Sequence, residues 1–112
     1  MKIKQNPQGE TMVLELSGKI MGGPDHDKFK AEVTDVLEKD FRNVILDFSG
    51  VPWINSTGLG IIISGFHSIK AADGVMKVCS VKERVLSIFY ISQLENIFEV
   101  YGTRDEALAS FA

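Results

Sequence analysis

Alternating apolar and polar residues near the start of the chain predict a strand over residues 11–20. One face of this strand would carry Met12, Leu14 and Leu16. Residues 1–5 suit an edge strand that pairs with it. Residues 43–48, NVILDF, form a nearly continuous apolar run rich in β-branched side chains. This pattern is typical of a strand buried on both faces, so we expect it at the centre of a sheet.

Apolar residues at helical spacing follow the first two strands and the central one. Residues 21–40 predict a helix behind a glycine pair and Pro24. A second helix begins near Gly58 and ends at residues 73–74. Its sheet-facing side would consist of Leu59, Ile62, Ile63, Phe66 and Ile69. The side turned away would carry Thr57, Gly60, Ile61, Ser64, His67 and Ser68. An outward Ile61 among small residues would suit a docking surface.

The last third of the chain continues the alternation of strands and helices. Strands are predicted over residues 75–80 and 96–101. Two capping boxes, Ser80 with Glu83 and Thr103 with Glu106, indicate helices over residues 81–92 and 106–112. The element order is therefore ββαβαβαβα, which predicts a single α/β domain spanning residues 1–112. We expect a mixed, mostly parallel sheet of about five strands, packed by about four helices.

Composition and charge narrow the classes of function. The chain has 112 residues and a net charge of −3, without the basic stripe of a nucleic-acid-binding protein. It shows no apolar segment long enough for a membrane span or a signal peptide, so we expect a cytoplasmic protein without nucleic-acid or membrane partners. Cys79 is the single cysteine, which predicts a buried packing thiol.

The segment WINSTGLGIII, residues 53–63, poses the question of what its hydroxyls do. Ser56 or Thr57 could be the N-cap of the second helix. Gly58 and Gly60 weaken a helix, which indicates that the first turn is kept bare and accessible. Since a helix start attracts anions, a phosphate carried by Ser56 would be accommodated there. It would add negative charge to a neutral surface and expel a partner fitted to that surface.

Catalytic roles fit these residues poorly. A nucleophilic serine needs a base and an orienting acid, and the segment lacks the elbow that presents such a serine. A phosphoryl-aspartate receiver centred on Asp47 would need an acidic pair after the first strand, which the sequence does not supply. Residues 25–27, Asp-His-Asp, are more typical of a solvated helix start than of a metal site. We expect no enzymatic activity, no metal and no cofactor.

The run VILDFSGVPWINSTGLGIII, residues 44–63, resembles the signature of the STAS family, the bacterial anti-sigma factor antagonists. Asp47 and Ser49 match its first part, and residues 56–60 match its serine-threonine-glycine-leucine-glycine turn. The similarity extends over nearly the whole chain. It implies a phosphoprotein of signal transduction and transcription regulation that works by protein–protein interaction. The unmodified form would bind an anti-sigma factor with serine kinase activity and release sigma factor.

The resemblance also implies how such a protein is inactivated and restored. The kinase would phosphorylate Ser56, and a serine phosphatase would reverse this, with ATP and metal bound by these partners. The residues expected in the phospho-loop and partner-binding surface are Asp47, Ser49, Asn55, Thr57, Gly58, Gly60, Ile61 and Ser64. Asn55 replaces the aspartate of many members, and residues 18–29 form a longer, more glycine-rich connection than is usual. A STAS module that scaffolds signalling proteins or binds a small ligand, without phosphorylation, is the alternative.

Overall fold

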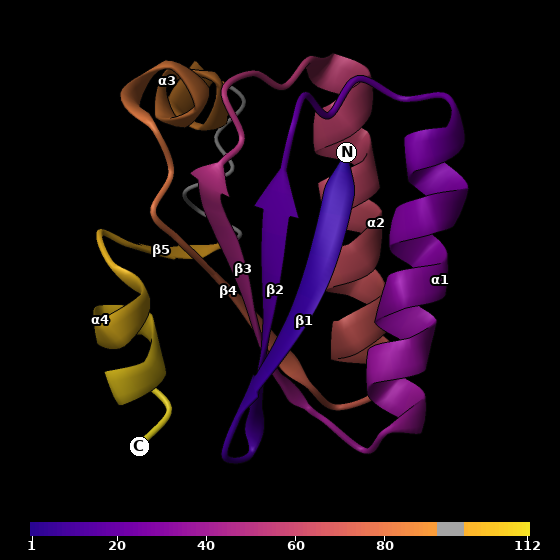
Figure 1. Cartoon of the computed structure of the whole chain (residues 1–112), viewed down its shortest axis with the longest axis vertical. Coiled ribbons are helices and arrows are strands. Elements are labelled where there is room, and N and C mark those ends of the chain that lie inside the picture. The colour runs from indigo at the N-terminus through magenta and orange to yellow at the C-terminus, as the bar shows by residue number, and fades with distance from the viewer. Residues whose placement is uncertain (92–97) are drawn as a thin grey trace.

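The computed structural model describes residues 1–91 and 98–112 and confirms the predicted element order (Figure 1). Five strands and four helices lie within these residues, in the order β1 (Lys2–Gln8), β2 (Thr11–Ser17), α1 (Pro24–Glu38), β3 (Asn43–Gly50), α2 (Ser56–Ala71), β4 (Val75–Cys79), α3 (Glu83–Ile91), β5 (Glu99–Tyr101) and α4 (Arg104–Ala109). Within the part of the chain described, no helix is both long and apolar enough to cross a membrane.

The strands form one sheet in the order β1-β2-β3-β4-β5. The first two strands pair antiparallel and all the others parallel, so the predicted mixed, mostly parallel sheet is confirmed. β3 is the middle strand, and residues 44–48 within it are buried. A strand flanked on both sides and covered on both faces needs apolar residues in succession, which explains the run NVILDF.

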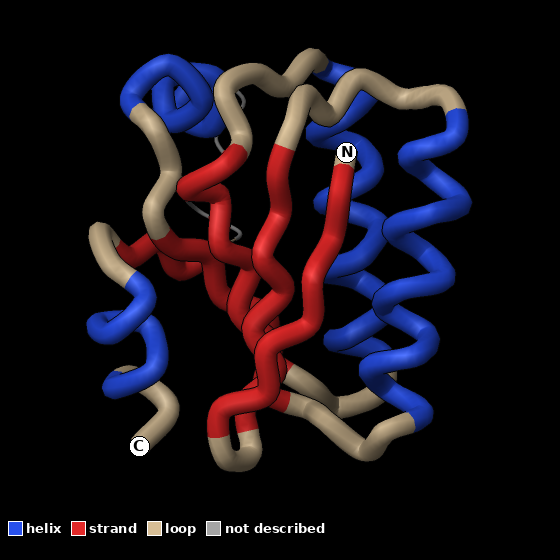
Figure 2. The backbone as a smooth tube through the Cα atoms, in the orientation of Figure 1, coloured by secondary structure: helices blue, strands red, loops and turns tan. Residues whose placement is uncertain are grey.

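Helices cover the two faces of the sheet unequally. α1 and α2 lie together on one face and α4 on the other, as Figures 1 and 2 show. The larger hydrophobic core lies between α1, α2 and the sheet, and α3 adds Val85 and Phe89 to it. A smaller cluster of Val13, Ile45, Cys79 and Ala107 lies beneath α4. The Cys79 side chain is fully buried there, as expected for a packing thiol.

The two predicted capping boxes have different outcomes. Thr103 caps α4, since its hydroxyl accepts a hydrogen bond from the Glu106 amide at 3.1 Å. The box at Ser80 is wrong, because α3 begins only at Glu83. Ser80 has a φ of +59°, a left-handed conformation that turns the chain after β4, whereas an N-cap needs extended backbone. β5 starts at Glu99, and residues 96–97 of the predicted strand lie outside the described part.

Candidate functional site

Two loops lie at the carboxyl ends of β2 and β3 (Figure 2), and the second of them ends at Ser56, the first residue of α2. One leads from β2 to α1 and the other from β3 to α2. Ile20 and Ile54 form an isolated parallel bridge between them. The Ile20 amide donates to the Trp53 carbonyl at 3.2 Å, and the Asn55 amide donates to the Ile20 carbonyl at 3.3 Å. Both isoleucines are also fully buried. The bridge, the two hydrogen bonds and this burial together hold the bases of the two loops to each other.

Asn55 is the N-cap of α2, so the prediction that Ser56 or Thr57 caps this helix is wrong. The Asn55 side-chain oxygen accepts a hydrogen bond from the Gly58 amide at 2.8 Å. Asparagine is among the preferred N-cap residues, and Asn55 directly precedes the serine. Ser56 is therefore the first helical residue, exposed at the end of α2, and its hydroxyl is not used for the cap.

The two glycines of the first turn serve different purposes. Gly58 is buried, and a Cβ there would collide with the carbonyl of Ile20 and come within 2.8 Å of the Ile54 side chain. The expectation that Gly58 keeps the surface bare is wrong, since this glycine lets α2 pack directly on the β2–α1 loop. Gly60 is exposed, and a Cβ there would meet no described heavy atom within 4 Å. Only Gly60 leaves the surface open.

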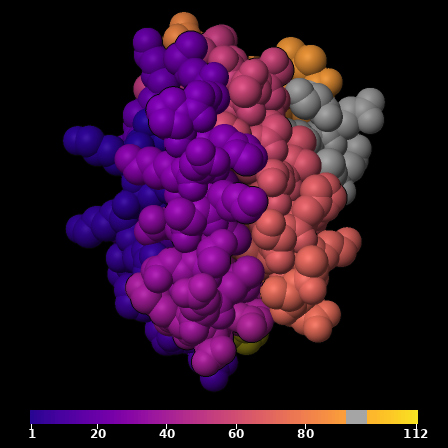
Figure 3. All heavy atoms as spheres, turned by 90° about the vertical axis from the view of Figure 1, so that its right-hand side faces the viewer, coloured from indigo at the N-terminus to yellow at the C-terminus, as the bar shows by residue number. Residues whose placement is uncertain are grey.

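Ile61 does not face solvent, contrary to the helical projection. Its side chain is only 3% exposed, and it lines a small hollow against α1 together with Phe29 and Val33. Figure 3 shows α1 and α2 side by side on this face. The helical projection assumed that α2 is buried only where it faces the sheet. It therefore assigned to solvent the side of α2 that packs against α1. A charge at position 61 would therefore disturb folding.

The surface around Ser56 is uncharged in the first turn of α2. Thr57 and Gly60 are exposed in the same turn, and this turn contains no acidic residue. Ser64 is also exposed, but it lies about 12 Å further along the helix axis. Met21 of the β2–α1 loop is 48% exposed, and its carbonyl accepts a hydrogen bond from the Asn55 side chain. The structure thus brings Ser56 together with Asn55, Thr57 and Gly60, whereas Ser64 lies beside the hollow against α1. It adds Met21, which the sequence analysis did not single out.

Asp47 and Ser49 lie at the end of β3, where Asp47 fixes α4 to the sheet. Asp47 is 4% exposed, and its carboxylate accepts bonds from Arg104 at 2.7 and 3.1 Å and from the Ser49 amide at 2.9 Å. Arg104 also donates to Glu15 of β2 at 2.9 Å. Burial alone raises the pKa of Asp47, but the Ser49 amide and the Arg104 guanidinium outweigh it and hold this pKa below its usual value. Asp47 therefore has a structural role, because its ion pair with Arg104 holds the start of α4 to the sheet.

Substitution of Asp47 by Asn is expected to cost about 1.5–3 kcal/mol of unfolding free energy at pH 7, because the charged bonds to Arg104 are lost. The depressed pKa means that the wild-type carboxylate stabilises the fold above about pH 4 and loses this effect as pH falls through the lower folded pKa. Urea unfolding at pH 7 and pH 3 should show the difference between the proteins shrinking in acid. The exposed Asp40→Asn is the control. An equal difference at both pH values would contradict this role.

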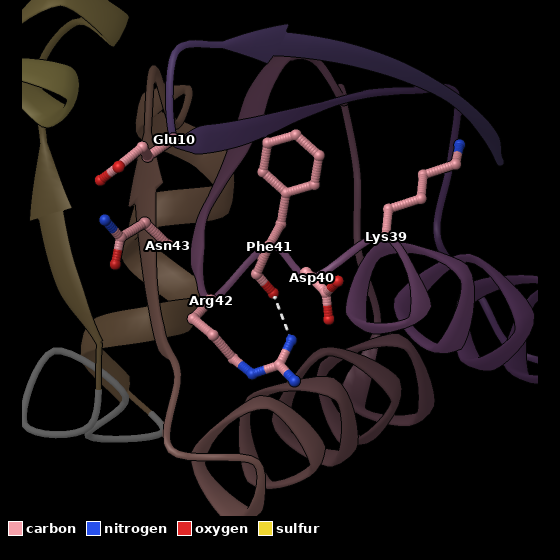
Figure 4. A pocket seen from close by; sticks show the side chains of 6 residues that line it. All are labelled: Glu10, Lys39, Asp40, Phe41, Arg42 and Asn43. Carbon is pink, nitrogen blue, oxygen red and sulfur yellow. Dashed lines mark hydrogen bonds between the residues drawn. The ribbon is translucent and has the colours of Figure 1, made fainter.

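A hollow at the opposite end of the sheet has no connection with Ser56. It has a volume of about 380 Å³ and is lined by Glu10, Lys39, Asp40, Phe41, Arg42 and Asn43 (Figure 4). The Arg42 guanidinium already donates to the backbone carbonyls of Leu37 and Phe41 at 3.1 and 3.0 Å.

Among the described residues, no group of three or more His, Cys, Asp or Glu side chains is placed to hold a metal ion.

These features are those of a small α/β domain with an exposed serine at a helix start, and comparison with known proteins identifies the class. The chain belongs to the STAS domain family, whose family model matches residues 2–107. The expected resemblance is therefore confirmed. The relatives of this chain include a candidate anti-sigma factor antagonist of Bordetella bronchiseptica and the anti-sigma F factor antagonist of Paenibacillus polymyxa.

Three relatives show how far the similarity extends. BtrV of Bordetella bronchiseptica, a candidate anti-sigma factor antagonist, is 26% identical over 111 residues, which cover 99% of this chain and 95% of the relative. The crystal structure of a candidate antagonist from Thermotoga maritima has a TM-score of 0.84 at 26% identity and covers 96% of this chain and 92% of its own. SpoIIAA of Bacillus, solved in its phosphorylated form, shares the fold with a TM-score of 0.74 at 17% identity, over 99% of this chain and 100% of its own.

Proposed function

We propose that this protein is an anti-sigma factor antagonist and that Ser56 is its phosphorylation switch. The unmodified protein binds an anti-sigma factor that is also a serine kinase, and this binding releases sigma factor for transcription in the cytoplasm. Phosphorylation of Ser56 ends the binding, and a serine phosphatase restores it. ATP and metal belong to the partners.

The exposed position of Ser56 is the observation that carries the proposal. Because Asn55 provides the cap, the Ser56 hydroxyl is left for modification at the positive end of α2. One amide of the first turn, that of Gly58, is already taken by the cap. A phosphate on Ser56 would thus act mainly on the outer surface, where it adds a charge of about −1.5 to −2. The antagonist names of the relatives and the phosphorylated form of SpoIIAA agree with this mechanism.

Mass analysis of the phosphorylated chain tests the proposal. The tagged full chain captures the anti-sigma factor from an extract of its own bacterium, and this captured kinase is expressed and incubated with the chain and ATP. One phosphate is expected by intact mass, located on Ser56 by fragment analysis. Ser56→Ala should take none, and Thr57→Ala, which removes the adjacent hydroxyl, should take one. Phosphate on another residue, or none while binding is intact, would contradict the switch and favour the scaffold or ligand-binding alternative.

A further inference from the structure

The side chain of Asn55 forms hydrogen bonds in two directions. Its oxygen accepts from the Gly58 amide of α2 at 2.8 Å, and its nitrogen donates to the Met21 carbonyl of the β2–α1 loop at 3.1 Å. An amide can do both at once, because it carries an acceptor oxygen and a separate donor nitrogen on one carbon. The cap of α2 is thereby connected with a loop 34 residues away in sequence.

The bond from Asn55 matters more for the tip of the β2–α1 loop, residues 21–23, than for its base at Ile20. The base is held by the backbone bonds of Ile20 and by the Ile20–Ile54 bridge. Beyond the base, Gly22 and Gly23 have φ values of +105° and +60°. Glycine adopts such values readily, and without a side chain its backbone is less restricted than that of other residues. Gly22 also lies against the Thr57 side chain, whose methyl carbon is 2.7 Å from the position of a Cβ. Towards α1, the Met21 amide donates to the Asp25 carboxylate at 3.4 Å, and the Gly22 and Gly23 carbonyls accept bonds from backbone amides of the first turn. The Asn55 nitrogen supplies the hydrogen bond that connects Met21 with α2 instead.

We infer that Asn55 is a positioning residue that presents Met21–Gly23 and the turn carrying Ser56 to the kinase as one rigid surface. The inference rests on the proposed function, because it assigns a regulatory contact to the same site. Loss of the bond to Met21 would leave the cap and the serine unchanged but detach the exposed Met21 from α2, while its amide bond to Asp25 remains. The kinase would then have to order the loop on binding, so recognition would weaken while the transfer of phosphate would not.

Two substitutions separate the bond from the charge at this position. Asn55→Ser keeps a good N-cap and stays neutral, but it has no group that can donate to Met21 at this distance. Asn55→Asp also keeps a cap acceptor and loses the donor, while it adds a negative charge. Asn6→Ser on β1 is the matched control, since Asn6 pairs with Val13, away from the loop that follows β2.

The first measurement is of the full chain alone. Backbone order parameters of Met21, Gly22 and Gly23 should fall from about 0.85 in the wild type and Asn6→Ser to below about 0.6 in both Asn55 variants. The second uses the captured kinase. Asn55→Ser should raise KM for the chain about three- to tenfold, the value of one hydrogen bond, with kcat unchanged.

Unchanged order parameters in Asn55→Ser would overturn the inference, as would a lower kcat with an unchanged KM. An effect confined to Asn55→Asp would also overturn it, since charge would then be the cause. If the wild-type chain takes no phosphate on Ser56, the proposed function fails, and the loop measurement still decides whether Asn55 holds the loop.

Discussion

Substitution of Gly58 by Ala is expected to lower the free energy of unfolding by about 3 kcal/mol, the upper part of the range for overpacking. The added Cβ would collide with the Ile20 carbonyl, which is backbone and cannot move by changing a rotamer. Ile20 is held in place by its own bonds to Trp53 and Asn55, so the α2 start has to move instead. That movement would also separate the two loops that surround Ser56.

Gly60→Ala is the matched control for this effect. It places the same methyl group two residues further along the same helix, where it meets no described atom within 4 Å apart from its chain neighbours and the nearby backbone of the helix itself. Since alanine is a better helix former than glycine, the control should be neutral or more stable by up to about 1 kcal/mol. Urea unfolding of the three proteins at one pH provides the comparison. Equal stability of Gly58→Ala and Gly60→Ala would show that the contact with Ile20 does not constrain α2.

The order of elements could be predicted from the sequence because it depends on local periodicity. Strands with one or two buried faces and helices with an apolar side leave patterns within a few residues, and the alternation of the two patterns determines a parallel sheet. The central position of β3 followed from the same logic, since its residues 44–48 are buried in succession. The identity of Ser56 as an exposed residue at a helix start also followed, although the capping residue did not.

The features that the sequence did not show are contacts between distant segments. Ile61 is buried because α1 packs beside α2, and Gly58 is required because Ile20 lies across it. Arg104 pairs with Asp47 across 57 positions of sequence, so no spacing rule connects them. Such contacts depend on the three-dimensional arrangement and leave no period along one segment. The sequence did carry one indication of the cap. Asn55 directly precedes Ser56, and asparagine is as good an N-cap as serine.

Ser56→Asp is expected to weaken binding to the captured anti-sigma factor about tenfold, and phosphorylation of Ser56 by a hundredfold or more. The aspartate adds one charge to a surface without acidic residues in the first turn of α2, whereas a phosphate adds up to two. A partner fitted to the neutral surface would have to bury these charges without a compensating group, at a cost that rises with the charge. Ser56→Ala adds no charge and should bind like the unmodified wild type.

Position along α2 separates this local effect from a general effect of charge. Ser68→Asp makes the same change at an exposed serine of the same helix, about 18 Å further along its axis. Titration calorimetry should give wild-type affinity for Ser68→Asp and for Ser56→Ala, even after Ser56→Ala is incubated with kinase and ATP. Equal affinities for Ser56→Asp and Ser56→Ala would contradict an electrostatic switch. Equal losses for the two aspartate variants would mean that the overall charge of α2, and not the first turn, governs binding, because the two variants differ only in where the charge lies.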